Sequence, residues 1–196
     1  MNRCSWCNQN NPIYIKYHDE EWGVLRTDDP YLFEMLILES FQAGLSWECV
    51  LNKREAFRNA YDHFKLEKVS AYDEKKIEEL IENEGIIRNR LKIKASIKNA
   101  RVFKSILEEY GSFYTYLKTF TKGKVYHEIG KTTNKLSDQI SLDLKKRKMS
   151  FVGSTIIYSY LQAIGVINSH ERNCQFYMKN DIIKKKDGNS NEKRTL

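Results

Sequence analysis

Apolar residues recur along most of this chain at intervals of three and four, the spacing that gives a helix one apolar face. We find no convincing alternation of the kind that strands require, and no internal repeat, so the predicted fold class is all-α. Residues 13–23 are predicted as a short helical or irregular segment ending at Gly23, and 121–136 as loop. The strongest helical patterns cover residues 29–43, 46–61, 89–110, 113–120 and 154–164.

Capping residues set the expected ends of several helices. Ser70 followed by Asp73 resembles a capping box, which predicts a helix running to about Asn83. Gly111 is expected to end the long helix, and Ser112 to begin the next one. Ser137 is predicted to begin a helix that runs into the basic cluster at 145–148.

The helix predicted at 29–43 carries an acidic residue on its apolar side. Asp29 is the expected N-cap, and Pro30 suits the first helical position. Glu39 falls three, four and seven residues after apolar positions, so it shares their face. A buried carboxylate needs a partner or a function, and the plain alternative is a structural Glu bonded to a backbone N–H.

Three residues after Glu39 the same segment ends in a tight break. Gln42 lies one turn later on the same line, Gly44 is expected to end the helix, and Ser46 can cap a second one. Trp47 follows directly. The pattern therefore predicts that a carboxylate, an amide and an indole meet at one corner. All three tryptophans, at 6, 22 and 47, precede residue 50, which favours a stacking pocket over ordinary core packing.

The 196 residues carry a formal net charge of +7. Such a balance is typical of nucleic-acid binding, although simple solubility is the alternative. No apolar run approaches the length of a membrane span, and the first residues contain no secretory signal, so we expect a cytoplasmic protein. We predict one domain of two helical lobes over 1–175 and a disordered, lysine-rich tail over 176–196.

Cysteine and histidine are grouped near both ends of the chain. Cys4 and Cys7 form a CxxC pair, His18 follows, and His170 is separated by three residues from Cys174. Zinc is the leading interpretation, and spacing alone does not choose between Cys7 and His18 as the second ligand of the first half-site. Four protein ligands would make the site structural. Free thiols and a redox role for the CxxC pair are the alternatives.

A basic turn separates the last two predicted helices. Lys148 begins it, Gly153 ends it, and Ser154 and Thr155 open the final helix. Backbone N–H groups at a helix N-terminus bind phosphate without sequence preference. We therefore name Lys148, Gly153, Ser154 and Thr155 as candidate contacts to a DNA backbone, with a solvated corner as the alternative.

These residues together resemble the bacterial 3-methyladenine DNA glycosylase I family over roughly residues 1–175. The matching pieces occur in family order: Arg3-Cys4, Tyr17-His18-Asp19-x-Glu21-Trp22-Gly23, Leu32-Phe33-Glu34, Leu38-Glu39, Gln42-Ala43-Gly44-Leu45-Ser46-Trp47, Gly85-Ile86-Ile87-Arg88, Phe151-Val152-Gly153-Ser154-Thr155 and His170-x3-Cys174. Met149-Ser150 departs from the glycine-aromatic pair of the family hairpin. The chain also lacks the aspartate that other superfamily members carry after the hairpin helix.

The resemblance implies a helix-hairpin-helix glycosylase fold. It also suggests that the protein is a monomer. It implies one structural Zn²⁺ per chain, held by Cys4, His18, His170 and Cys174. Cys7 is kept as the runner-up ligand. It implies a base-binding pocket formed by Trp6, Tyr14, Tyr17, Trp22, Glu39 and Trp47. The turn Ala43-Gly44-Leu45 would enter the gap that a flipped base leaves in the duplex.

The activity implied is DNA repair by base excision: hydrolysis of the N-glycosidic bond of 3-methyladenine in alkylated double-stranded DNA, with no strand cutting. The base would have to be flipped out of the helix. Glu39 is expected to recognise the methylated base and stabilise charge, rather than to activate water as a general base. The rival interpretation is a zinc-stabilised helix-hairpin-helix module that binds DNA without catalysis.

Overall fold

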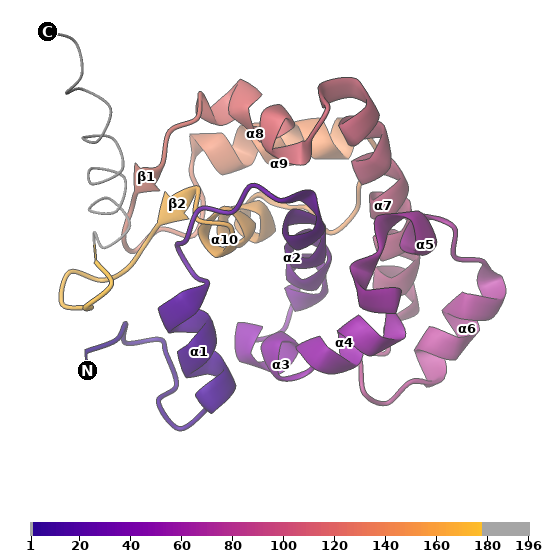
Figure 1. Ribbon diagram of the computed structural model, residues 1–196, viewed down its shortest axis with the longest axis horizontal. Helices are drawn as coiled ribbons and strands as arrows, with labels where there is room; N and C mark the ends of the chain where they lie inside the picture. The colour runs from indigo at the N-terminus through magenta and orange to yellow at the C-terminus, as the bar shows by residue number, and fades with distance from the viewer. Residues whose placement is uncertain (1, 178–196) are drawn as a thin grey trace, which may run out of the picture.

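The computed structural model of the chain describes residues 2–177 and is almost entirely helical (Figure 1). The predicted tail over 176–196 lies outside the described residues except for its first two positions. The elements, in order, are α1 (Pro12–Glu20), α2 (Asp29–Gln42), α3 (Trp47–Asn52), α4 (Arg54–Ala60), the short 3₁₀ helix η1 (Asp62–Phe64), α5 (Leu66–Ser70), α6 (Glu74–Glu82), α7 (Arg90–Tyr110), α8 (Phe113–Thr121), β1 (Tyr126–His127), α9 (Lys135–Lys146), α10 (Ser154–Ala163) and β2 (Ile167–Asn168). The all-α prediction is confirmed apart from the two short strands.

Helix α2 lies at the centre of the molecule, with α3, α7, α8 and α10 packed around it (Figure 1). Ten consecutive residues, from Leu32 to Phe41, are buried. A helix buried on every side cannot be amphipathic in the ordinary sense. Glu34 and Glu39 are thus buried together with its apolar positions, and each requires a physical explanation.

Two adjacent acidic residues at the start of α2 make different hydrogen bonds. The predicted N-cap, Asp29, is wrong by one position, because the Asp28 carboxylate accepts the Tyr31 N–H at 3.3 Å. Asp29 instead accepts the backbone N–H of Phe113 at 2.8 Å and so ties the start of α8 to α2. Sequence could not distinguish the two carboxylates, because they are adjacent and both lie just before Pro30.

Other predicted helix ends are partly confirmed. Gly111, at φ +80°, ends α7 and Ser112 caps α8 as expected, while Asn89, predicted as the first residue of the long helix, is its N-cap. The helix predicted at 46–61 is two helices, separated at Lys53. The cap of α6 is Asp73 rather than Ser70. Ser70 is the last residue of α5, and its hydroxyl donates to the backbone carbonyl of Glu67.

The segment predicted as loop at 121–136 contains β1, which pairs in parallel with β2. Tyr126 N–H donates to Val166 O at 2.9 Å, and Glu128 N–H donates to Asn168 O at 3.1 Å. The helix that follows begins at Lys135, and Ser137 occupies the third position of a capping box with Asn134. Strands of two residues contain no alternation, so only the tertiary structure reveals them.

A buried ion cluster joins α1, α2 and α4. The Arg54 guanidinium donates to Glu34 Oε1 at 2.6 Å and to Glu21 Oε2 at 2.7 Å. Tyr31 OH also donates to Glu21, at 3.1 Å. Because buried charges are tolerated only when they are paired and hydrogen-bonded, this cluster accounts for Glu34 and fixes the end of α1 against α2.

The two ends of the described chain meet beside α1, where Gln175 N–H donates to Asn2 O at 3.0 Å (Figure 1). Over residues 2–177, none of the helices combines the length and the apolar character that crossing a membrane requires.

Gly165 allows α10 to end directly against the segment after α1. It has φ +72°, and a Cβ atom there would lie 2.1 Å from the carbonyl carbon of Val24. We expect Gly165→Ala to lower the free energy of unfolding by more than about 3 kcal/mol, since strain and a backbone clash add. Gly123→Ala is the control, because Gly123 has φ +71° but no atom within 4 Å of that Cβ.

Gly123→Ala should lower the free energy of unfolding by only about 1–2 kcal/mol, because it introduces the strain of a left-handed backbone without a clash. Urea denaturation of both variants measures the difference. Equal losses in the two variants would show that the close approach at Gly165 does not constrain the fold.

Candidate functional site

One cavity of about 420 Å³ lies between the N-terminal helices and α10. All six residues predicted to bind a base line it, together with residues from both halves of the chain. The lining comprises Ser5, Trp6, Tyr14, Tyr17, Trp22, Glu39, Gln42, Trp47, Ile129, Gly130, Lys131, Ser159, Gln162, Ser169 and Glu171.

The carboxyl group of Glu39 is the most unusual group in this cavity. Its residue is 2% exposed, and Oε2 has no hydrogen-bond partner among the described residues. Burial alone raises the pKa of Glu39 well above its ordinary value of 4.5. The alternative of a structural Glu satisfied by a backbone N–H therefore finds no support at Oε2, and the carboxyl is left available to a ligand.

Two further polar atoms beside Glu39 are also unpaired. Gln42 Oε1 and Trp47 Nε1 are buried and have no partner in the described part of the chain. Leaving a buried polar group unsatisfied costs about 1–3 kcal/mol. Three such groups on the lining of one cavity indicate a site whose partners arrive with a ligand.

Aromatic rings form the walls. The rings of Tyr17 and Trp47 have centroids 5.3 Å apart, and those of Trp6 and Trp22 lie 4.5 Å apart, edge to face. Tyr14 contacts Trp6 at 5.4 Å. Burial, followed by the nearby Glu39 charge, raises the pKa of Tyr17 well above its usual range, so its hydroxyl stays protonated and can donate. Such walls favour a flat ligand and attract positive charge.

Sequence reasoning missed the half of the cavity contributed by the C-terminal elements. Ser159 and Gln162 come from α10, and Gln162 Nε2 donates to Ser169 Oγ at 2.7 Å. Residues 129–131 reach the cavity from the loop after β1. Their spacing contains no chemical motif, so only the packing of α10 against α2 brings them to the site. Gln42 carried a signal, since it stands one helical turn after Glu39.

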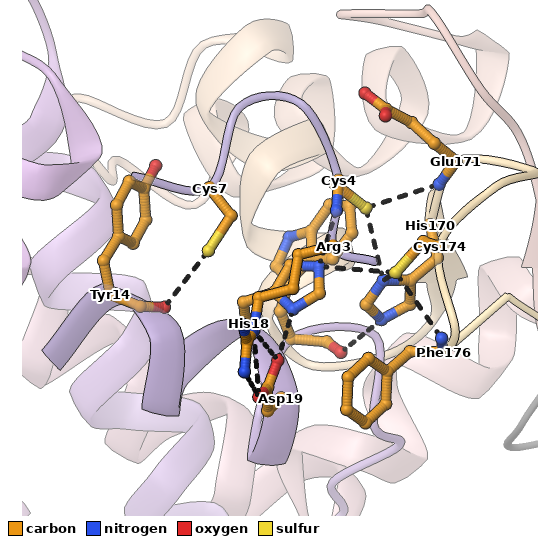
Figure 2. Close-up of polar contacts among 11 residues, drawn as sticks. Arg3, Cys4, Cys7, Tyr14, His18, Asp19, His170, Glu171, Cys174 and Phe176 are labelled. Carbon is orange, nitrogen blue, oxygen red and sulfur yellow. Dashed lines mark hydrogen bonds and ion pairs between the residues drawn. The ribbon is translucent and has the colours of Figure 1, made fainter. Parts of the chain in front are cut away.

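Beside the cavity, Cys4, His18, His170 and Cys174 converge (Figure 2). Their four ligand atoms all lie within 4.8 Å of one another, and all four residues are buried. Cys4 Sγ and Cys174 Sγ each lie 3.5 Å from His170 Nδ1, and Cys174 Sγ lies 3.6 Å from His18 Nε2. This group has the composition and compactness of a metal-binding site.

Neighbouring groups orient each of these ligands. His18 Nδ1 lies 2.8 Å from Asp19 Oδ1, which leaves Nε2 facing the group, and Arg3 binds the same carboxylate through two nitrogens. Burial would raise the pKa of Asp19, but the hydrogen bonds from Arg3 and His18 lower it. His170 Nε2 lies 3.2 Å from Trp22 O, so its Nδ1 is the free ligand atom. Such supporting bonds are typical of metal-binding histidines.

The two sulfurs are supported in the same way. Glu171 N–H donates to Cys4 Sγ and Phe176 N–H donates to Cys174 Sγ, both at 3.4 Å (Figure 2). Burial raises the pKa of Cys4 to about 12 and lowers that of His170 to about 4. Cys7, the runner-up ligand, points away, with its Sγ 3.9 Å from Tyr14 O. The geometry thus brings together the set that includes His18.

The four candidate DNA-backbone residues lie around the start of α10. Lys148 is exposed at φ +77°, and Thr155 is exposed on the first turn. Gly153 is the N-cap of α10, and no side chain caps this helix. The Ser154 hydroxyl is already bonded to Ser137 Oγ at 2.9 Å and to Asp138. Backbone N–H groups and Lys148, rather than the Ser154 hydroxyl, are therefore the groups available to a phosphate.

Known proteins resemble this chain in sequence and in structure. A sequence model of the methyladenine glycosylase family matches residues 6–178. DNA-3-methyladenine glycosylase 1 of Escherichia coli (strain K12) is 44% identical over 184 residues, which are 90% of this chain and 97% of that protein. A crystal structure of 3-methyladenine DNA glycosylase I aligns with a TM-score of 0.84 at 43% identity, covering 89% of this chain and 98% of the other. A tyrosine-to-phenylalanine variant of 3-methyladenine DNA glycosylase I in complex with 3-methyladenine aligns at 0.85 and 32% identity, covering 89% and 97%.

Replacing the buried carboxyl of Glu39 with a neutral amide is expected to stabilise the protein above about pH 4.5. Because the folded pKa of Glu39 is raised, the native state holds a proton that the unfolded chain loses above about pH 4.5, so stability falls as pH rises from there. Glu39→Gln lacks this penalty. We expect its Tm to exceed that of the wild type by about 2–6 °C at pH 8, where about 1–2 kcal/mol is recovered.

The difference should vanish near pH 4, where the carboxyl is protonated in both states. Thermal melts of wild type, Glu39→Gln and the exposed control Glu82→Gln across this range test the sign. A gain that is independent of pH, or shared by the control, would contradict the assignment of the shift to Glu39.

Proposed function

The chain belongs to the methyladenine glycosylase family, and on this premise we propose that it excises 3-methyladenine from alkylated DNA by hydrolysing the N-glycosidic bond. It is a DNA N-glycosylase of base-excision repair. The observation that carries the assignment is the cavity in which Glu39 Oε2, Gln42 Oε1 and Trp47 Nε1 have no hydrogen-bond partner among residues 2–177. A cavity of about 420 Å³ lies within the usual range of small-molecule sites, roughly 300–1,000 Å³.

Recognition rests on charge as well as shape. Methylation at N3 makes the adenine ring of the nucleotide cationic, whereas unmodified adenine is neutral. Burial disfavours the Glu39 carboxylate, and a cationic base favours the charged form by supplying its partner. Each good contact of the cation with Tyr17 or Trp47 adds roughly 0.5–2 kcal/mol. Neutral adenine gains neither contribution.

The chemical step needs little assistance once the base is held. The damaged base, flipped out of the helix at reduced cost, leaves with the electron pair of its bond to the sugar and becomes neutral. Water supplies the oxygen that bonds to C1′ and loses one proton. We assign Glu39 to recognition and charge stabilisation. Among the described residues that line the cavity the one lysine, Lys131, is ion-paired with Glu128 at 3.1 Å, which favours hydrolysis without a lyase step.

The metal-binding group fits zinc. Tetrahedral Zn²⁺ has Zn–S distances of about 2.3 Å and Zn–N distances of about 2.0–2.1 Å, which separate sulfur and nitrogen ligands by about 3.5 Å. Three S···N separations, from Cys4 Sγ to His170 Nδ1 and from Cys174 Sγ to both histidines, are 3.5–3.6 Å. One Zn²⁺ per chain, with Cys4, His18, His170 and Cys174 as ligands, leaves no open position and is structural. It would join the two ends of the chain beside Trp22, whose carbonyl supports His170.

DNA is the proposed partner, in double-stranded form, with the chain acting as a monomer in the cytoplasm. The pair α9 and α10 with its basic turn is proposed as a helix-hairpin-helix that holds the DNA backbone through Lys148 and the first N–H groups of α10. The turn Ala43-Gly44-Leu45 is proposed to enter the gap left by the flipped base. Leu45 is 40% exposed there, and Gly44 has φ +78°.

Excision is tested on duplex DNA treated with a methylating agent, by chromatography of the bases released. We expect 3-methyladenine to be released by the wild type, and Glu39→Gln to release it at least about 100-fold more slowly, as is typical when one electrostatic stabiliser is removed. Glu82→Gln is the exposed control and should match the wild type. DNA binding without any base release would favour the non-catalytic binding module.

Zinc is tested by metal analysis of the purified protein, with Cys174→Ala compared with the matched variant Cys7→Ala. We expect about one zinc per chain in the wild type and in Cys7→Ala, and none in Cys174→Ala. Loss of the metal should lower Tm by about 10 °C, the equivalent of about 3–4 kcal/mol in a chain of this size. Zinc retained by Cys174→Ala, or lost from Cys7→Ala, would overturn the ligand set.

A further inference from the structure

Helix α7 is bonded to both of the turns proposed to face DNA. Lys92 is 8% exposed, and its ammonium donates to Phe41 O at 2.9 Å and to Ala43 O at 2.6 Å, at the C-terminal end of α2. Asn99 is fully buried, accepts the Ser150 N–H at 2.9 Å and donates to Ser150 O at 2.9 Å. The two residues are seven apart, so they share one face of α7.

These bonds fix the separation of the two turns. Lys92 holds the start of the turn at 43–46, and Asn99 holds the turn between α9 and α10. Seven residues of helix rise about 10.5 Å, which corresponds to about three base steps along one DNA strand at about 3.4 Å each. The N-terminal half of α7 therefore lies between two proposed DNA contacts at a spacing that suits a short stretch of one strand.

A hollow of about 290 Å³ lies along this part of α7, against the α9–α10 turn. It is lined by Leu91, Lys94, Ala95, Lys98, Ser150 and Phe151, and its lining contains no acidic residue. Leu91 is 71% exposed, the largest exposure among the big apolar side chains of the described residues. Phe151 lies half-buried at φ +55° on the other side. An apolar surface this open, beside lysines, is suited to the sugars and phosphates of a nucleic-acid strand.

The charges around the hollow are positive and not all paired. Lys94 lies 3.0 Å from Glu74, which neutralises part of its charge. Lys98 and Lys148 are exposed, and neither has an ion pair with a carboxylate among residues 2–177. Lys98 is therefore the cation of the hollow that is free to meet a phosphate.

We propose that this hollow binds the sugar-phosphate backbone of one DNA strand between the turn at 43–46 and the α9–α10 turn. Lys98 contacts a phosphate, and Leu91 packs against deoxyribose. The inference rests on the proposed function in that it takes DNA as the partner. Charge complementarity and continuity with the α9–α10 turn, which contributes Ser150 and Phe151 to the lining, select a nucleic-acid strand as the occupant.

The test measures affinity for an unmodified DNA duplex of about 20 base pairs as a function of salt, so it does not depend on excision. Losing one phosphate contact makes the negative slope of log K against log salt shallower by about 0.9. At 0.1 M salt this corresponds to a loss of about eightfold in affinity. We expect this change for Lys98→Ala. Lys75→Ala is the matched control, since it removes the same charge from an exposed position on α6 outside the hollow.

A second variant separates the apolar contact from the ionic one. Leu91→Ala keeps every charge, so it should weaken duplex binding about three- to tenfold while leaving the salt slope unchanged. Identical slopes and affinities for wild type, Lys98→Ala and Leu91→Ala would overturn the proposal, as would equal losses in Lys98→Ala and Lys75→Ala. If the wild type releases no 3-methyladenine while Lys98→Ala still loses the slope, the proposed function fails and the strand-binding hollow stands.

Discussion

A carboxyl group buried without a hydrogen-bond partner is the constraint on which this structure depends. Glu39 loses hydration, and its Oε2 gains no hydrogen bond from the described part of the chain, so the fold is less stable than it would be with a neutral residue there. The surrounding structure maintains this arrangement: α2 is buried along ten consecutive residues, and the Arg54 cluster satisfies the other buried acid of the helix, Glu34. The unsatisfied group is therefore confined to the cavity, where the proposed cationic base would meet it.

The rest of the fold positions the walls and the rims of that cavity. The Cys and His group brings the N-terminal segment, with Trp6, against the C-terminal segment, and the Trp22 carbonyl is one of its supports. Gly165 lets α10 approach closely enough for Ser159 and Gln162 to complete the cavity. On the opposite side of α2, Lys92 fixes the turn after Gln42. The Cys and His group, the close packing at Gly165 and the buried Lys92 thus all act on the surroundings of one cavity.

Much of this could be predicted from local signals, and the failures have a common cause. Sequence alone placed Glu39 on the buried side of its helix, ended α7 at Gly111 and grouped the three tryptophans. Each of these features depends on residues that are close in sequence. Asp29 was misplaced because its real partner, the Phe113 N–H, is 84 residues away. The β1–β2 pair, the break at Lys53, and Gln162 depend likewise on tertiary contacts. Spacing also left Cys7 and His18 as alternatives, which the family resemblance decided and the side-chain directions support.

The most direct test of the central claim is the titration of the Glu39 carboxyl itself, followed by NMR in protein carrying ¹³C-labelled glutamate, with Glu39→Gln used to assign the signal. The account predicts that this carboxyl titrates far above pH 4.5 in the free protein. It also predicts that adding free 3-methyladenine lowers the midpoint, because the base supplies the donors that the cavity lacks. A midpoint near 4.5 in the free protein, or one that the base leaves unchanged, would contradict the account.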